Sequence, residues 1–524
     1  MKRITYNHKT MIKISPPWKI LIILSCLATM AMYAETMLIP AIPTLINDFD
    51  VSYGLSSWIL TSYLIAGAVM TPIAGKLSDI FGRKKILLII MSIYTVGVLM
   101  GGLAGDFLTM IVARTIQGIG LGMFPIAFSI IRDQFPRERI SITTGIITSM
   151  FAAGSVIGLS VGGLIVHEYG WKMTFFTIIP IAILLLLMIR KYVRVSEIST
   201  PPPNDDKTIG SDIELDNTNS TSDTKFKGNQ RFYSQIDIKG SILLAITIVS
   251  FLLSLTYLQT PSAEDQTLNM SEVGSLNPDS SMNQIIPFLI IGTVALLLFV
   301  YQERKSKYPL IDFRIFLKPP ILLSNLIIMI VGLSMFMVFQ TVPILVQSPQ
   351  PIGFGENAIS TGIIQLPFAI VLLVFGPTSG FIISKMGSIK PIILGTILTA
   401  AGFSILLLFH STELFISIGL AVLSTGLSLA SVGAVNVTIL STPIEYTGVT
   451  MGISTMLRIV GSSIGPALAA MYMQTNQSLL NIQGISTAVP SSFSFALIFF
   501  TALMFSMAAI GMSIVLGKKL RVRT

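Results

Sequence analysis

Residues 75–85 read GKLSDIFGRKK and place one acid, four bases and two glycines in eleven residues. Long stretches with almost no charge lie on either side. Of the 524 residues, 52% are hydrophobic and 11% are charged, against about 25% charged in an ordinary soluble domain. Apolar runs of about 20 residues, enough to cross a hydrocarbon layer about 30 Å thick, recur along nearly the whole chain. Because lipid offers no partners to exposed backbone groups, this pattern predicts an all-α integral membrane protein.

The apolar runs between polar breaks predict fourteen membrane-spanning helices. The first run continues too far for the apolar part of a cleaved signal, so we expect it to be retained as a span. The expected spans are residues 18–45, 55–75, 86–105, 108–131, 141–166, 172–192, 238–258, 285–301, 321–346, 359–383, 390–409, 412–438, 448–472 and 493–516.

The distribution of lysine and arginine supports this count, because these residues concentrate in cytoplasmic loops. With fourteen spans and both termini in the cytoplasm, all of the 34 basic residues fall on the cytoplasmic side except Lys172, Arg114 and Arg458. We therefore expect a multi-pass protein of the cell membrane. The net charge of +9 follows from this topology, and no soluble basic domain suggests a nucleic-acid partner. The single cysteine excludes an intramolecular disulfide.

Two sets of residues recur at nearly the same offset, which predicts a duplicated chain. The pairs at an offset of 305 are Pro72 and Pro377, Gly75 and Gly380, and Gly82 and Gly387, and those at an offset of 307 are Pro136 and Pro443, Gly154 and Gly461, and Gly158 and Gly465. Two six-helix bundles would then face each other across a cavity, and rocking would open it to alternate sides. The expected parts are an N-terminal bundle at 1–192, a flexible cytoplasmic linker at 193–237, an inserted two-helix hairpin at 238–301, a cytoplasmic loop at 302–320, a C-terminal bundle at 321–516 and a tail at 517–524.

Two motifs carry a family resemblance. The stretch GKLSDIFGRKK resembles the G-x-L-x-D-x-x-G-R-[KR]-[KR] signature of the major facilitator superfamily, and RTIQGIGLG resembles the R-x-x-Q-G-x-G pattern of its fourth span. PLIDFRIF and LRIVGSSIG are similar to stretches of the fourteen-span drug:proton antiporter branch. The matched residues are Gly75, Asp79, Gly82, Arg83 and Lys84 in the first motif, and Arg114, Gln117, Gly118 and Gly120 in the second.

The resemblance covers nearly the whole chain and implies the major facilitator fold and secondary transport. It also implies a gate in which Asp79 and Arg83 meet helix ends of the opposite bundle. The simpler alternative is that Arg83, Lys84 and Lys85 only anchor the third span at the cytoplasmic surface. In the second half Ser384 takes the place of the acid, so we expect an asymmetric lock.

The fifth span departs from the antiporter signature G-x-x-x-G-P-x-x-G-G. It reads GSVIGLSVGG and keeps Gly154, Gly158, Gly162 and Gly163, but Leu159 stands where proline is expected. In the other half, the proline is present as Pro466, after Gly461 and Gly465. Glycines four residues apart share one helix face and let a neighbouring helix approach closely. The missing proline keeps symport and facilitation open beside antiport.

Three charged residues lie deep within the expected spans, namely Glu35, Arg114 and Arg458. A charge at a helix centre costs about 2.5 to 3.5 kcal/mol on insertion scales, so each is a functional candidate. We expect Glu35 to carry the proton, with Arg114 near it at a similar depth. The alternative is a static Glu35–Arg114 pair that only holds two spans together. Met37, Phe124 and Arg458 are candidates for the wall of a substrate cavity.

These observations predict a secondary active transporter, proton-coupled and exporting amphipathic or toxic small molecules. An importer or symporter of the same fold is the nearest alternative. We do not expect an enzyme: Ser160 and Ser463 match G-x-S-x-G, but that motif requires a strand–turn–helix setting, whereas both serines lie inside apolar helices. No H-E-x-x-H zinc site or nucleotide-binding loop occurs, so we expect no metal or cofactor. The expected partners are a small molecule, protons and the lipid bilayer, with the protein acting as a monomer.

Overall fold

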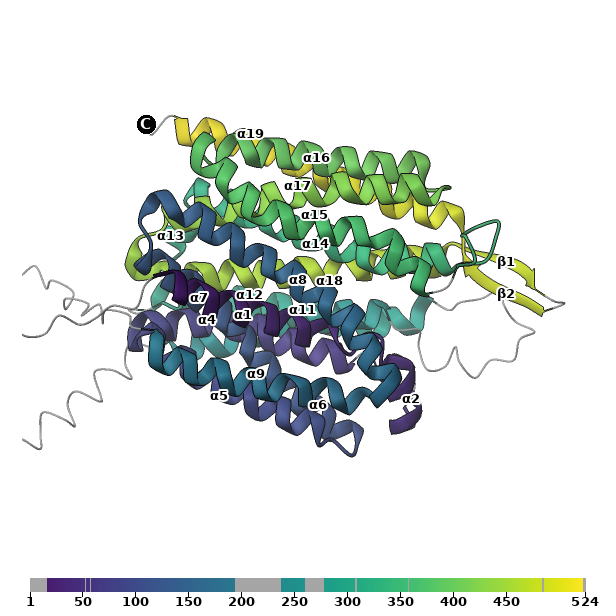
Figure 1. Cartoon of the computed structure of the whole chain (residues 1–524), viewed down its shortest axis with the longest axis horizontal. Helices are drawn as coiled ribbons and strands as arrows, with labels where there is room; N and C mark the ends of the chain where they lie inside the picture. Colours follow the sequence, from purple (N-terminus) through teal and green to yellow (C-terminus); the bar gives the residue numbers. More distant parts are fainter. Residues whose placement is uncertain are drawn as a thin grey trace, which may run out of the picture.

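The computed structural model describes residues 17–51, 53–56, 58–193, 237–259, 278–306, 309–356, 358–482 and 485–521. Within these residues, fourteen helices are long and apolar enough to cross a membrane, which confirms the expected number. They pack side by side along one direction (Figure 1). The expected linker at 193–237 lies almost entirely outside the described residues.

The spans follow one another in the order that the sequence predicts. The first six are α1 (Pro17–Thr36), α4 (Trp58–Phe81), α5 (Arg83–Gly102), α6 (Phe107–Gly118) continued by η1 (Ile119–Gly122) and α7 (Met123–Gln134), α8 (Arg137–Tyr169) and α9 (Trp171–Tyr192). The inserted hairpin is α11 (Ile238–Gln259) and α12 (Pro278–Lys305). The last six are α14 (Pro319–Gln347), α15 (Ala358–Met386), α16 (Ile389–Phe409), α17 (Glu413–Ser441), α18 (Thr447–Thr475) and α19 (Ser492–Arg521).

Short elements join the spans at both ends. They are α2 (Ile42–Phe49), α3 (Tyr53–Ser56), α13 (Phe313–Phe316), η3 (Ile444–Tyr446) and the antiparallel strands β1 (Gln477–Ile482) and β2 (Ile485–Pro490). Figure 1 shows α13 and the C-terminus at one end of the molecule and the β1–β2 hairpin at the other. We call the first the basic end, because Arg83, Lys84 and Lys85 begin α5 there, and the second the far end.

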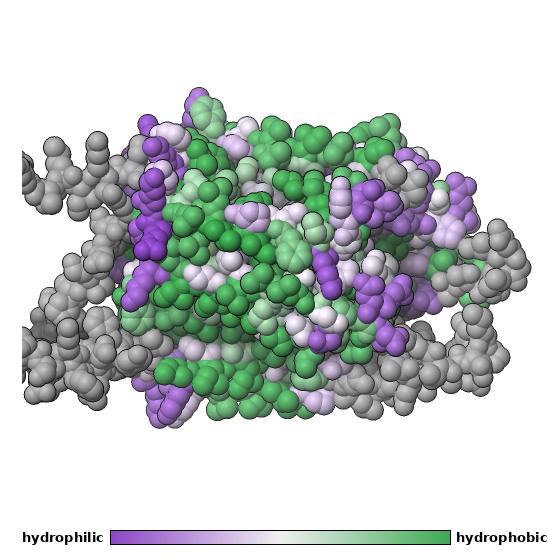
Figure 2. Space-filling view, turned by 60° about the horizontal axis from the view of Figure 1, so that its bottom comes forward, coloured by the Kyte–Doolittle hydropathy of each residue, from purple (hydrophilic) through white to green (hydrophobic). Residues whose placement is uncertain are grey.

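Apolar side chains form a band between these two ends. Figure 2 shows hydrophobic residues across the middle of one face and hydrophilic residues gathered toward its ends. The face of a span that touches no other helix is apolar, as at Leu184, Leu297 and Leu408. This is the surface expected of a protein that is surrounded by lipid.

Several helix boundaries differ from the sequence prediction, and two of them bear on the site. The first span was expected to run to residue 45, but α1 ends at Thr36. Pro40 has no amide hydrogen to donate to the Thr36 carbonyl, so the helix cannot continue through it. The second span was expected to end near residue 75, but α4 continues to Phe81. Only Gly82, with a φ of 94°, separates α4 from α5, so Asp79 lies on the last turn of a helix rather than in a loop.

The duplication is visible in the way the helices pack. Glycines of α8 face carbonyl oxygens of α1, and the matching glycines of α18 face carbonyl oxygens of α14. The four pairs are Gly154 with Thr29, Gly158 with Tyr33, Gly461 with Met329 and Gly465 with Leu333. Each α14 residue follows its α1 counterpart by 300 positions, while α18 follows α8 by 307. Because Glu35 belongs to α1, the offset of 300 applies to it, and the corresponding residue of α14 is Met335.

Candidate functional site

A cavity of about 550 Å³ lies between the two bundles. Its walls come from α1, α4 and α8 of the first bundle, α14, α15 and α18 of the second, and also α11. This volume is within the range of pockets that hold small molecules. The lining residues of α4 and α15 lie near the starts of these helices, so the cavity occupies the half of the molecule toward the far end.

The cavity wall is mainly apolar and aromatic, with uncharged polar groups among the apolar ones. Phe336, Phe339 and Phe368 contribute rings, and Gln340 and Gln365 contribute amides. Ser160 and Ser463 also line it, and both lie inside long helices rather than on a strand–turn–helix elbow. Among the described residues of the wall, Glu35 has the only charged side chain.

Glu35 is almost completely enclosed by protein. Its side chain lies at the end of α1, is 6% exposed, and has one carboxyl oxygen, Oε2, without a hydrogen-bond partner. The guanidinium groups of Arg458 and Arg114 both act on it electrostatically. Neither forms an ion pair with it within 4.0 Å in the described part of the chain. The conformation described here thus contains no direct Glu35–Arg114 pair.

Arg114 instead holds the backbone of two neighbouring helices. Its Nε donates to the carbonyl of Ile59 at 3.0 Å, and its Nη1 donates to the carbonyl of Ala34 at 2.9 Å. Nη1 also donates to Oε1 of Gln117 at 2.6 Å, and the guanidinium lies 4.3 Å from the centre of the Tyr63 ring. Because Ala34 directly precedes Glu35, Arg114 fixes the segment of α1 that carries the acid.

The glycines of the span-4 motif let α6 come close enough for these bonds. A Cβ on Gly118 would lie 2.3 Å from the Tyr63 carbonyl oxygen, and a Cβ on Gly120 would lie 2.4 Å from the Tyr94 ring. Any larger residue would push α6 and η1 away from α4 and α5. The motif is therefore a packing surface that brings Arg114 to α1.

The glycines of α8 form the contact with α1 beside Glu35. A Cβ on Gly158 would lie 2.1 Å from Thr36 Oγ1, and Thr36 Oγ1 donates to the Ser155 carbonyl at 3.0 Å. Further along α8, Gly162 and Gly163 lie against Met37 and Pro40. Leu159, which replaces the proline of the antiporter signature, lines the cavity. Pro466, at the matching position of α18, lines it too.

The same substitution at two glycines tests this contact. We expect Gly158→Ala to lower the free energy of unfolding by about 1–3 kcal/mol, because an added methyl group overpacks the α1–α8 contact. Gly511→Ala is the matched control: a Cβ there meets nothing within 4 Å, so the better helix former should be neutral or gain up to about 1 kcal/mol. Thermal unfolding in detergent measures both. Equal unfolding temperatures for the two variants would contradict the contact.

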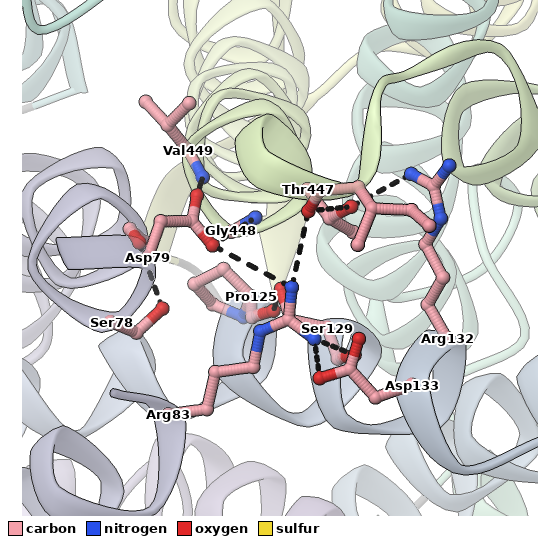
Figure 3. A network of polar contacts seen from close by, with 12 residues as sticks. Ser78, Asp79, Arg83, Pro125, Ser129, Arg132, Asp133, Thr447, Gly448 and Val449 are labelled. Atoms are coloured by element: carbon pink, nitrogen blue, oxygen red, sulfur yellow. Dashed lines mark hydrogen bonds and ion pairs between the residues drawn. The ribbon is translucent and has the colours of Figure 1, made fainter. Parts of the chain in front are cut away.

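At the basic end, Asp79 caps a helix of the opposite bundle. Its carboxylate accepts hydrogen bonds from the backbone amides of Gly448 at 3.1 Å and Val449 at 3.0 Å (Figure 3). These amides belong to the first turn of α18, which begins at Thr447. First-turn amides have no partner within their own helix, and the helix dipole favours an anion there. One carboxylate thus joins α4 to α18.

Arg83 lies at the centre of the same network. It is 3.9 Å from Asp79, forms an ion pair with Asp133, and donates to the carbonyl of Ser129 at 2.8 Å (Figure 3). It also donates to the carbonyl of Ile444, in the opposite bundle, at 3.2 Å. Arg83 therefore holds Asp79 in place and makes a second bond between the bundles.

Arg132 completes the network, although the sequence did not single it out. It donates to Thr447 Oγ1 at 2.7 Å and to the carbonyls of Thr442 and Pro443, just after the last turn of α17. The only sequence signal was its positive charge at the cytoplasmic end of the expected fourth span. We call Asp79, Arg83 and Arg132 together the basic-end clasp.

Other residues of the first motif have supporting roles. Gly82 provides the positive φ between α4 and α5, and a Cβ there would meet nothing within 4 Å. Lys84 donates to the carbonyl of Arg190 at 2.8 Å, near the end of α9, so it holds α5 within its own bundle. Lys76 donates to the carbonyl of Pro309 at 3.0 Å, in the segment before α14.

Backbone contacts close both seams between the bundles at this end. Glycines of one helix lie directly against the backbone of another, at positions related by the duplication. The contacts are Gly75 with Gly448 and Gly452 with Thr71 on the α4–α18 side, and Gly380 with Ser141 and Gly145 with Gly376 on the α8–α15 side. Across the first seam the Asp79 carboxylate bonds to α18, whereas Ser384, the counterpart of Asp79, donates to the carbonyl of Phe381 in its own helix.

Between the clasp and the cavity lies a layer of aromatic rings. The ring of Phe151 packs edge-on against those of Phe124 and Phe128, with ring centres 4.6 Å and 6.3 Å apart. The guanidinium of Arg458 lies 5.5 Å from the centre of the Phe151 ring. Because Arg458 belongs to α18 and the rings to α7 and α8, this layer joins the bundles beneath the cavity.

Three residues expected in the cavity wall do not line it. Phe124 and Arg458 belong to the layer beneath it, and Met37 is buried against Gly162 of α8. A flexible side chain in a span faces a neighbouring helix as readily as a cavity, and sequence alone does not give its direction. A role of these three residues in substrate binding stays a prediction.

The arrangement resembles that of known transporters. The family model described as the Major Facilitator Superfamily matches residues 24–466. The chain is 26% identical over 488 residues to an uncharacterized MFS-type transporter, YhcA, of Bacillus subtilis, covering 91% of this chain and 80% of the relative. It is 24% identical over 443 residues to the multidrug transporter protein MdtP of the same organism, covering 84% and 72%.

A solved structure shares the fold. The human organic anion transporter MFSD10 (TETRAN) superposes with a TM-score of 0.62 at 13% identity, covering 95% of this chain and 99% of that protein. With the family model spanning most of the chain and fourteen spans arranged as two packed bundles with an inserted hairpin, the chain belongs to the major facilitator superfamily.

Proposed function

We propose that this transporter is a proton-coupled exporter of amphipathic small molecules that works by alternating access in the cell membrane. The observation that carries the proposal is a cavity between two bundles whose described wall holds one charged side chain, the buried Glu35. The basic end is taken as cytoplasmic because lysine and arginine concentrate on that side. The conformation described here is then closed toward the cytoplasm.

Glu35 has the properties of a proton carrier. Burial in low dielectric favours a neutral carboxyl, whereas nearby guanidinium groups favour the carboxylate. Rocking of the bundles changes both influences, since Arg114 belongs to the bundle of Glu35 and Arg458 to the other. A proton taken up from outside would be released inside, and substrate would leave in exchange. Met335 stands at the equivalent position of the second half, so this cavity wall offers one such carboxyl.

The basic-end clasp is proposed as the inner gate. Asp79 bonds to the start of α18, Arg83 bonds to η3, and Arg132 bonds to the start of α18 and to the segment just after α17. All these bonds must break before the cavity can open to the cytoplasm. Hydrogen bonds to charged groups contribute about 1.5–3 kcal/mol each. A few of them suffice to bias a two-state equilibrium without locking it permanently.

The nature of the cavity wall supports amphipathic substrates. Aromatic rings and several amide or hydroxyl groups surround a single acid, which suits molecules with a large apolar part and few polar groups. The multidrug description of the relative MdtP is consistent with this substrate class.

Transport by purified protein in vesicles with an imposed pH gradient tests the proposal. Accumulation of an amphipathic dye against its own gradient should require a pH gradient of opposite direction and should collapse when a protonophore is added. Accumulation in the same direction as the proton gradient would instead identify a symporter. Equal steady-state accumulation with and without the gradient would contradict proton coupling altogether.

A further inference from the structure

Helix α11 belongs to the inserted hairpin, yet it forms part of the cavity wall. Leu252, Leu255 and Thr256 line the cavity beside residues of α4 and α18. The helix packs against α4 of the first bundle and α18 of the second, as well as against its partner α12. It therefore lies across the seam where α4 and α18 meet. Twelve spans already form the two bundles, so this contribution is additional to the duplicated fold.

The orientation of α11 is fixed by one continuous face. Leu252, Leu255 and Thr256 are spaced i, i+3 and i+4, so they share that face. Toward the basic end the same side continues with Leu244 and Ile248, which are buried in the main hydrophobic core. Packing along this stripe therefore holds the part of α11 toward the far end against the cavity.

The second seam between the bundles is different. On the α8–α15 side, the described wall residues come from those two helices alone, among them Val156, Ser160 and Leu366. The duplication relates the two seams to each other, as the paired glycine contacts at the basic end show. The inserted helix therefore adds a wall to the cavity at the α4–α18 seam that has no equivalent among the described residues at the α8–α15 seam.

We propose that α11 is a specificity-determining wall of the substrate cavity. Leu252, Leu255 and Thr256 contact the apolar part of a bound amphipathic molecule and limit its size on the α4–α18 side. The Thr256 hydroxyl donates to the Leu252 carbonyl at 2.9 Å, so its hydrogen is already used within the helix. The inference rests on the proposed transport function, because it assigns the cavity to substrate.

A series of probes with one charge and increasing size tests this wall. Tetraethyl-, tetrabutyl- and tetraphenylphosphonium would be titrated onto the purified full chain, with transport measured in vesicles. An indole at position 255 fills space that a large ligand needs, so Leu255→Trp should weaken tetraphenylphosphonium binding at least about tenfold and change tetraethylphosphonium binding by less than about threefold. Leu255→Ala enlarges the cavity, so it should change the ratio of tetraphenylphosphonium affinity to tetraethylphosphonium affinity in the opposite direction.

Ile246→Trp is the matched control, because Ile246 lies on the same helix, is 40% exposed and does not line the cavity. It should leave all three affinities unchanged. Size-exclusion profiles and unfolding temperatures establish that each variant is folded. If wild type binds and transports the probes while both Leu255 variants keep its affinity ratios, the inference is overturned and the transport function stands. If the Leu255 variants alter the affinity ratios but transport does not respond to a pH gradient, only proton coupling is overturned. If no probe binds at all, both the inference and the transport function are overturned.

Discussion

Glu35→Gln is expected to abolish accumulation driven by a pH gradient, leaving uptake at the level of protein-free vesicles. Glutamine keeps the size of the side chain and one of its two oxygens, but it cannot exchange a proton near neutral pH. Binding of tetraphenylphosphonium to the variant should stay measurable, since the rest of the wall is unchanged. Transport in vesicles and binding in detergent, measured on the same preparation, separate the two effects.

The control for this substitution is Glu168→Gln, which removes an exposed carboxylate at the end of α8. It should transport as wild type does. A purely structural Glu35 would give another pattern, with a lower unfolding temperature and coupling that remains. Unchanged coupling in Glu35→Gln would rule out this residue as the proton carrier.

Asp79→Asn is expected to open the basic end. The substitution keeps the shape of the side chain but loses the negative charge that accepts from the Gly448 and Val449 amides at the start of α18. Since each charge-assisted bond contributes about 1.5–3 kcal/mol, the fraction of molecules open at this end should rise at least about tenfold. Transport should fall in parallel, because the gate no longer closes efficiently.

Maleimide labelling measures this opening. With Cys26→Ser removing the single native thiol, Ser149→Cys places a reporter that is 1% exposed and packed against Gly376 in the α8–α15 seam. Its labelling rate should rise in Asp79→Asn. Ser384→Asn changes the equivalent position of the second half, where the side chain bonds only within its own helix, and should leave the rate unchanged. Equal rates in all three backgrounds would mean that Asp79 only anchors its helix.

The sequence predicts the large features of this molecule well. Apolar length and the distribution of basic residues give the fourteen spans, because both depend on the bilayer rather than on details of packing. Glu35 and Asp79 are also found from sequence, the first as an isolated acid in an apolar run and the second through its motif. The cost of a buried charge makes the position of Glu35 conspicuous.

Contacts between residues of different bundles are harder to predict from sequence. Arg132 meets the end of α17 about 310 residues later in the chain, and its acceptors are backbone carbonyls that any residue could supply. The direction of Met37 and the contribution of Leu255 to the cavity depend on how helices rotate against one another. Hydrophobic pattern does not specify this when every face of a span is apolar.

The distance between the two bundles at the basic end tests the central claim most directly. Spin labels at Arg139→Cys on α8 and Lys385→Cys on α15, both exposed in the wild type, would be measured in the Cys26→Ser background. The account predicts a short and a long distance whose populations change with pH, and a loss of that pH dependence in Glu35→Gln. A single unchanging distance at every pH, with and without tetraphenylphosphonium, would contradict it.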